Sequence, residues 1–201
     1  VTMFVGALLA LFSVDLKRTL ACSSMSQIGF IMVGVGMMGL LGENNALAAQ
    51  GTLLHMVNHS LIKLTLFMAA GVVFMNLHKL NLNDIRGWGR RRWGLMILFF
   101  IGAASISGIP LFSGYASKTL LHESIVEYIV HLQEHGHGAF WYQAAEWVFI
   151  ISGGLTFCYM LKLFITIFVE KHPTRQEEFD RMGRSMTPLS AVAIGLSALL
   201  V

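Results

Sequence analysis

Long apolar runs alternate with short polar segments along the whole chain. The apolar runs extend over residues 1–14, 19–42, 46–76, 93–131, 141–170 and 186–201. A helix needs about 20 mostly apolar residues to cross a hydrocarbon core of roughly 30 Å. The pattern therefore predicts an all-α, polytopic bundle of transmembrane helices, forming one transmembrane domain over residues 1–201. Because the chain starts and stops inside apolar runs, we expect it to be a fragment of a longer protein.

The run 46–76 carries a row of polar side chains near its middle. His55, His59 and Lys63 are spaced four residues apart, so they lie on one face of a helix. A lysine at the centre of a spanning helix costs roughly 2.5–3.5 kcal/mol on insertion scales, so it normally faces protein or water. Ionisable residues inside a membrane indicate function, and this row predicts a proton relay.

The run 93–131 contains Pro110, which interrupts a helix because it has no N–H and its ring clashes with the carbonyl of Ile106. Gly108 lies beside it and belongs to the predicted break. Two interpretations compete. The run crosses the membrane once as a helix broken at Pro110, or it crosses twice as two short helices.

The distribution of positive charge favours the single crossing. Of the fourteen Lys and Arg residues, eleven then fall on one side of the membrane and none on the other, whereas two crossings would divide them seven to four. Basic loops lie preferentially in the cytoplasm. The eleven residues are Lys17, Arg18, Lys79, Arg86, Arg90, Arg91, Arg92, Lys171, Arg175, Arg181 and Arg184.

Composition agrees with a membrane protein and excludes other classes. The chain is 55% hydrophobic and 12% charged, with a mean hydropathy of +0.66. Its net charge of +3 is explained by membrane orientation, so we expect no nucleic-acid partner. Cys22 and Cys158 lie in apolar runs outside any metal-binding spacing. No flavin, iron–sulfur or quinone motif is visible, and we expect no cofactor.

Three lysines remain inside apolar runs: Lys63, Lys118 and Lys162. Lys118 follows Pro110 by eight residues, and His122 lies one turn further on. Burial of a lysine disfavours its charged form, and histidine titrates near neutral pH. Broken helices recur at the ion sites of transporters. We therefore add Lys118 and His122 to the predicted relay, and expect Lys162 to extend towards the cytoplasmic surface.

Simpler explanations of the polar row stay open. Each histidine is also compatible with a hydrogen-bonded packing role. His55 and His59 have the i, i+4 spacing of a metal-binding pair, but no glutamate follows His55 in the zinc-protease pattern and no third ligand is evident. We therefore expect no metal site.

Three ordered motifs give the chain a specific resemblance. They are Asp15-Leu-Lys-Arg-Thr-Leu-Ala-Cys-Ser-Ser-Met-Ser-Gln-Ile-Gly29, His55-x3-His59-x3-Lys63, and Gly108-Ile-Pro-Leu-Phe-Ser-Gly-Tyr-Ala-Ser-Lys118. Together they resemble the antiporter-like subunits of respiratory complex I and their relatives in membrane-bound hydrogenases and Mrp-type antiporters. The similarity covers nearly all of residues 1–185.

The resemblance implies a fold and a role for individual residues. Family members contain two inverted five-helix repeats, each with a broken helix near a buried lysine, and this chain resembles the second repeat. Lys63 matches the central lysine, with His55 and His59 beside it. Lys118 matches the lysine on the broken helix at the channel outlet, and Lys17 matches the basic residue at the start of the neighbouring helix.

We therefore predict a membrane subunit that moves protons, or exchanges sodium for protons, within a redox-driven complex. The complex would be a complex I-like NADH:quinone oxidoreductase or a membrane-bound hydrogenase, and any redox chemistry would belong to its other subunits. The expected partners are other membrane subunits, hydrophilic redox subunits, the lipid bilayer, and protons or Na⁺. The alternatives are a stand-alone or Mrp-type cation/proton antiporter and a structural membrane scaffold. The expected location is a bacterial or archaeal plasma membrane.

Overall fold

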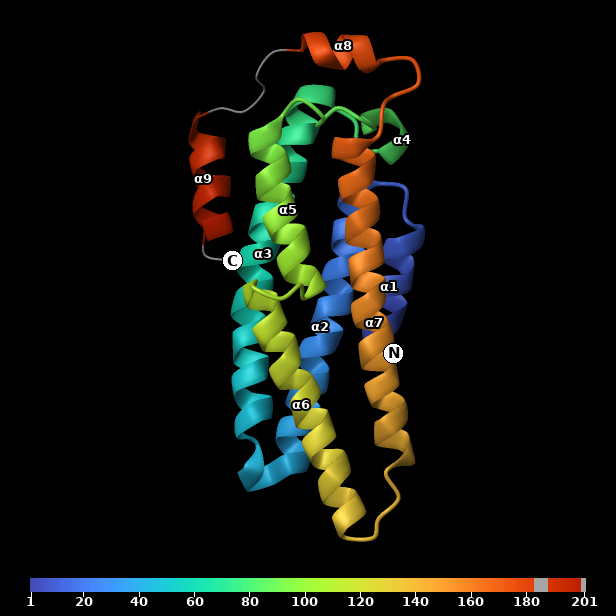
Figure 1. Cartoon of the computed structure of the whole chain (residues 1–201), viewed down its shortest axis with the longest axis vertical. Helices are drawn as coiled ribbons and strands as arrows, with labels where there is room; N and C mark the ends of the chain where they lie inside the picture. Colours follow the sequence, from blue (N-terminus) through green and yellow to red (C-terminus); the bar gives the residue numbers. More distant parts are fainter. Residues whose placement is uncertain (183–187, 200–201) are drawn as a thin grey trace.

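The computed structural model describes residues 1–182 and 188–199, and this part is built from helices (Figure 1). The elements are α1 (Thr2–Phe12), α2 (Leu16–Leu41), the 3-10 turn η1 (Gly42–Asn44), α3 (Ala46–Leu77), α4 (Leu82–Ile85), α5 (Trp93–Ser107), α6 (Ser113–Glu134), α7 (Phe140–Phe164), the π-helical turn η2 (Ile165–Val169), α8 (Gln176–Arg181) and α9 (Pro188–Leu199). The predicted all-α bundle is confirmed. Of the predicted run 186–201, residues 186, 187, 200 and 201 lie outside the described residues.

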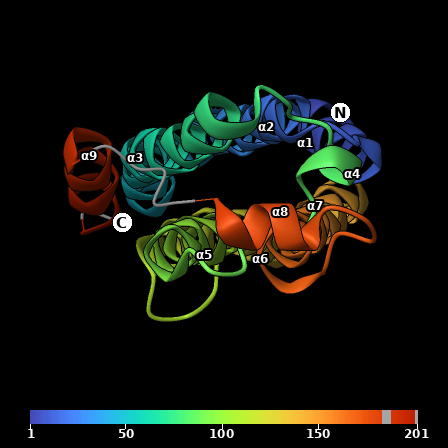
Figure 2. The ribbon, with the colours of Figure 1, turned by 90° about the horizontal axis from the view of Figure 1, so that it is seen from above.

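The long helices form two layers (Figure 2). One layer holds α1, α2 and α3, with α9 beside α3, and the other holds α5, α6 and α7. The layers meet where α3 packs on α5 and α6 and where α7 packs on α1 and α2. Side chains of the two layers therefore face each other along the centre of the bundle.

Three helices in the described part are long and apolar enough to cross a membrane: Leu16–Asn44, Ala46–Leu77 and Phe140–Val169. The helices Thr2–Phe12 and Trp93–Ser107 are apolar but shorter. The three long helices lie where the sequence predicts transmembrane segments.

Helix α2 begins three residues before the predicted start at Thr19. Asp15 is its N-cap, and the Asp15 carboxylate accepts the N–H of Arg18 at 2.9 Å. An aspartate at this position satisfies a backbone donor that the helix leaves free, which stabilises an earlier start. Lys17 and Arg18 therefore lie in the first turn of α2.

Glycines and small residues bring α1 and α2 into close contact. A methyl group at Gly29 would overlap the backbone of Met3, and one at Gly6 would overlap the backbone of Ser26. The Ser26 hydroxyl donates to the Met3 carbonyl at 2.7 Å. Because lipid supplies no hydrophobic drive between helices, such packing and hydrogen bonding hold the pair together.

Helices α5 and α6 follow one another along the long axis of the bundle (Figure 1). Residues 108–112 between them are not helical, and the backbone at Gly108 and Leu111 has positive φ values of 79° and 82°. A positive φ is unfavourable for leucine, so this turn holds a strained residue. The chain thus runs from one end of the bundle to the other with an interruption at its middle. That Pro110 causes the interruption stays a prediction.

The basic loops gather at one end of the molecule. The α1–α2 junction pairs with residues before α4, because Leu16 N–H donates to the Leu80 carbonyl at 2.9 Å. Arg86 forms an ion pair of 2.7 Å with Glu170, which connects the same end to the end of η2. Helices α4 and α8 lie there, while the α6–α7 loop lies at the opposite end (Figure 1). Arg184 is outside the described residues.

Candidate functional site

A band of buried polar side chains lies between the two layers of helices. They come from α2, α3, α6 and α7, and each is at most 9% exposed. An unpaired polar group is costly inside a protein or a bilayer, so the hydrogen bonds of these side chains determine how they lie. The main members are Ser23, Gln27, His55, Lys63, Ser117, Lys118, Ser152 and Thr156.

His55 is the centre of this polar band and is only 3% exposed. Its Nδ1 lies 3.0 Å from the Ser117 hydroxyl of α6, and its Nε2 lies 3.1 Å from Oε1 of Gln27 on α2. The Gln27 amide nitrogen donates to Thr156 of α7 at 3.4 Å, and Thr156 donates to the Ser152 carbonyl. Three helices thereby fix the imidazole of α3 in one orientation.

These partners suit both protonation states of His55. Gln27 Oε1 accepts, so Nε2 carries a hydrogen in either state. When the ring is neutral, the Ser117 hydroxyl donates to Nδ1. When the ring is charged, Nδ1–H donates to Ser117, whose own hydroxyl then donates to the Gly114 carbonyl 3.1 Å away. Rotation of one hydroxyl is therefore enough to accept or release a proton at Nδ1.

Lys63 is 7% exposed, and its Nζ donates to the Leu20 carbonyl of α2 at 3.0 Å. His59 lies between Lys63 and His55 on α3, and its Nδ1 is buried without a hydrogen-bond partner among the described residues. A buried unpaired ring nitrogen is uncommon. All three residues of the predicted row therefore lie on α3, and the middle residue, His59, has a ring nitrogen without a hydrogen-bond partner among the described residues.

Lys118 hydrogen-bonds to the backbone at the break between α5 and α6. Its Nζ donates to the Ile106 carbonyl at 2.7 Å and lies 5.1 Å from the centre of the Phe30 ring. In a continuous helix the Ile106 carbonyl would accept from the N–H of residue 110, which proline lacks. Lys118 supplies the missing donor. A side chain at Gly108 would press on the Lys118 stem, since an added Cβ would lie 3.2 Å from Lys118 Cδ.

A groove opens beside Lys118, between α6 and α7. It has a volume of about 490 Å³ and is lined by residues of α2, α5, α6 and α7, including Lys118, His122, Glu123 and Phe149. Nε2 of His122 lies 3.0 Å from Oε1 of Glu146 on α7. Lys118 and His122 therefore border the same space.

The structure separates Lys17 from this site. Lys17 is exposed at the start of α2 and lines a different groove with Phe67, Phe74 and Leu80. Both ring nitrogens of His55 are hydrogen-bonded, to Ser117 and to Gln27. Within residues 1–182 and 188–199, no cluster of three or more His, Cys, Asp or Glu is arranged to bind a metal ion.

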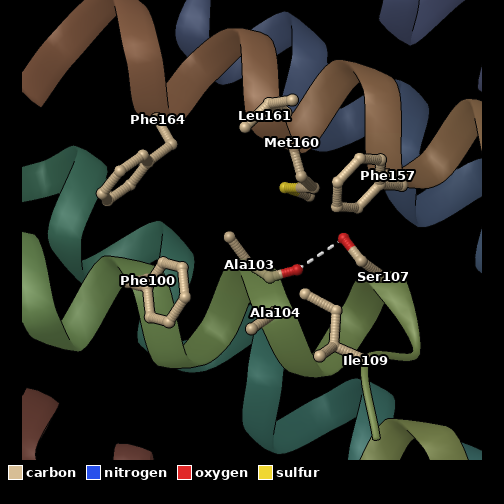
Figure 3. Close-up of a pocket in the computed structure, with 9 residues that line it drawn as sticks. All are labelled: Phe100, Ala103, Ala104, Ser107, Ile109, Phe157, Met160, Leu161 and Phe164. Carbon is tan, nitrogen blue, oxygen red and sulfur yellow. Dashed lines mark hydrogen bonds between the residues drawn. The ribbon is translucent and has the colours of Figure 1, made fainter. Parts of the chain in front are cut away.

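A second, apolar pocket lies between α5 and α7 (Figure 3). Phe100 and Ala104 of α5 face Phe157 and Met160 of α7 across it. Its lining holds one hydroxyl, Ser107, which donates to the Ala103 carbonyl at 2.6 Å. With no charged residue in its lining, this pocket is distinct from the polar band.

The sequence prediction omits Gln27, Ser117 and Glu146, as well as Ser23, Ser152 and Thr156 of the polar band. Gln27 and Ser117 are polar but not ionisable, so their role depends on which helices meet around His55. Glu146 lies inside the predicted run 141–170, and the rule that singles out Lys63 applies to it equally.

Comparison with known proteins agrees with these features. Residues 1–132 match the family described as NADH:quinone oxidoreductase/Mrp antiporter, transmembrane. The chain belongs to this family. It is a membrane protein family of the antiporter-like type, as the three motifs predict.

Its relatives include proteins of several complexes. The chain is 34% identical to NADH-ubiquinone oxidoreductase chain 5 of Wickerhamomyces canadensis over 84% of this chain and 24% of that protein. It is 29% identical to hydrogenase-4 component B of Escherichia coli K12 over 92% and 28%. The chain thus spans about a quarter of the length of these curated relatives. A chain in the structure of the Mrp complex from Dietzia sp. DQ12-45-1b has the same fold, with a TM-score of 0.77 and 21% identity over 99% of this chain and 41% of that one.

Proposed function

We propose that this chain moves protons across a membrane within a redox-driven complex, of the complex I or membrane-bound hydrogenase type. The observation that carries the proposal is the polar band, in which His55 links α2, α3 and α6 beside two buried lysines. A purely structural band needs no ionisable groups, and these are expensive inside a membrane. The polypeptide would work with other membrane subunits and with hydrophilic redox subunits that supply the driving force.

The proton would travel from Lys63 along His59 and His55 to Lys118. Lys63 and Lys118 each donate a hydrogen bond to a backbone carbonyl, so the nitrogen of each would stay in place while it exchanges a proton. His55 contacts Ser117, the residue that precedes Lys118 on α6. Water would fill the gap beside Nδ1 of His59, which has no hydrogen-bond partner among the described residues. Charge on a neighbouring subunit would favour release of the proton.

A second candidate is exchange of sodium for protons in an Mrp-type antiporter. The fold match to a chain of the Mrp complex favours it. Both candidates use the same lysines, and they differ in whether the protein purifies with redox subunits. For either one, we propose that the basic end of the bundle faces the cytoplasm of a bacterium or archaeon.

The deciding experiment replaces Lys118 by methionine in the full-length protein with its partners. Proton uptake is measured in inverted vesicles beside the turnover of the redox subunits. Removal of a proton-transfer group typically costs about 10²–10⁴-fold, so proton uptake by Lys118→Met is expected to fall about 10²-fold or more, while the variant still co-purifies with its partner subunits. Lys171→Met, in an exposed loop, is the matched control and retains uptake. Normal uptake by Lys118→Met would refute the proposal and favour a scaffold.

A further inference from the structure

A carboxylate outside the predicted relay pairs with His122, which lines the open groove. Glu146 is on α7, and its side chain is 25% exposed. A carboxylate within a membrane-spanning helix is costly unless it is paired or functional. Its partner is His122 of α6, with Nε2 and Oε1 3.0 Å apart. The pair therefore joins two helices at the wall of the groove that also exposes Lys118.

His122 and Lys118 both contact aromatic rings that line the groove. The His122 ring lies 6.0 Å from Phe149, Phe149 contacts Phe30 edge-on at 4.8 Å, and Nζ of Lys118 lies over Phe30. Residues four apart on a helix lie about 5–6 Å from one another at Cβ. A water occupies about 30 Å³ of liquid, so a groove of about 490 Å³ has room for several waters beside the two groups.

The other groups at this groove do not compete for the same role. Glu123 lines it but is exposed and forms no hydrogen bond within the described residues. Tyr115 and Thr119 also line it, and the Thr119 hydroxyl donates to the Tyr115 carbonyl at 3.0 Å. His122 is the histidine nearest to Lys118 along α6, and its Nε2 is paired with Glu146.

We propose that His122 and Glu146 form the acceptor pair that takes the proton from Lys118 and passes it to water at the end of the bundle that holds the α6–α7 loop. This inference rests on the proposed function. The N–H bond of the Lys118 ammonium breaks, a groove water carries the proton, and a new N–H bond forms on the neutral His122 ring. Lys118 is left as a neutral amine, and the imidazolium is held by the Glu146 carboxylate. His122 then loses the proton to water and returns to its neutral state.

The test keeps the contact between α6 and α7 while removing proton transfer. Glutamine at position 146 still hydrogen-bonds to His122, and arginine at position 122 still pairs with Glu146 but holds its proton permanently. Glu146→Gln and His122→Arg are therefore made in the full complex and measured by proton uptake in inverted vesicles. Glu146→Asp is the conservative variant that should restore uptake, and Glu123→Gln in the same groove is the matched control.

Uptake is expected to fall about 10²-fold in His122→Arg, since proton-transfer groups contribute about 10²–10⁴-fold. In Glu146→Gln, which keeps His122, a smaller loss of roughly tenfold is expected. Glu146→Asp and Glu123→Gln should stay near the parent rate. If both pair variants pump normally while Lys118→Met does not, the acceptor pair is wrong and the proposed function stands. If Lys118→Met also pumps normally, both the acceptor pair and the proposed function are wrong. Should His122→Arg not assemble, uptake by Glu146→Gln alone decides whether the pair accepts the proton.

Discussion

Lys118 and Lys162 make the same kind of contact at two places in the bundle. Each projects from a long helix and donates to backbone carbonyls where a shorter apolar helix ends. Lys118 on α6 binds the Ile106 carbonyl near the end of α5. Lys162 on α7 binds the carbonyls of Ala10, Leu11 and Ser13, at 3.2, 2.6 and 2.7 Å, at the end of α1. A cation is favourable at either site, because a helix C-terminus carries partial negative charge.

The surroundings of the two lysines differ. Lys162 directs all three of its donors to carbonyls, so its ammonium is fully used as a cap. Lys118 has one carbonyl, the face of Phe30, and a groove shared with His122. A contact with a helix end does not by itself separate a structural lysine from a relay lysine. We propose that the number of carbonyls and the presence of titratable neighbours distinguish the two roles.

The same substitution at both lysines gives the largest contrast. Arginine preserves the charge and the hydrogen bonds to carbonyls but does not release its proton in proteins. Lys118→Arg should assemble normally and lose proton uptake by about 10²-fold, because proton transfer stops. Lys162→Arg should keep uptake close to that of the parent. Vesicle uptake at equal protein content measures both, and equal rates in the two variants would remove the functional distinction between the two lysines.

Removal of the cap is expected to affect stability instead. Lys162→Met leaves three carbonyls at the end of α1 without their donor. A hydrogen bond to a charged group contributes about 1.5–3 kcal/mol, but the substitution also removes the cost of burying the ammonium, so we expect a net loss of about 1–3 kcal/mol and not the sum over three bonds. The measurement is the midpoint of thermal unfolding in detergent, with Lys171→Met as the control. A lost proton uptake in correctly assembled Lys162→Met complexes would contradict the structural role.

The lysines inside the apolar runs also show how much of the site can be predicted from the sequence. Burial of Lys63 and Lys118 follows from their position inside apolar runs, and the structure agrees. The position of Lys162 in its run predicts a side chain that extends towards the cytoplasmic surface, but it does not predict the contact of the Lys162 ammonium with the end of α1. That contact forms because α1 and α7 lie side by side, which no local pattern in either helix indicates.

The same limit applies to the polar band. Spacing of four residues predicts the row on α3, since it depends on one helix alone. The partners of His55 depend on the packing of α2, α6 and α7 around it, so spacing does not assign Gln27 and Ser117. The start of α2 is different, since Asp15 before Arg18 is a local capping signal that hydropathy alone does not register. Long-range contacts therefore account for most of what the sequence does not predict.

The smallest expected effect concerns Pro110, which is tied to Lys118 through one carbonyl. Pro110→Ala restores an N–H that can compete with Lys118 for the Ile106 carbonyl. The turn itself should survive, because Gly108 and Leu111 keep positive φ values that a continuous helix does not allow. Lys118 would then be held less firmly, and we expect uptake to fall about two- to fivefold, a cost below about 1 kcal/mol.

Pro173→Ala, in the exposed loop before α8, is the matched control and should pump like the parent. Equal uptake by Pro110→Ala and Pro173→Ala would mean that the carbonyl contact of Lys118 does not depend on proline. A loss as deep as that of Lys118→Arg would mean that proline holds the whole break, and Gly108 and Leu111 do not. The intermediate result is expected because Lys118 and the residue 110 N–H would share one acceptor, whereas the three carbonyls at Lys162 face no such competitor.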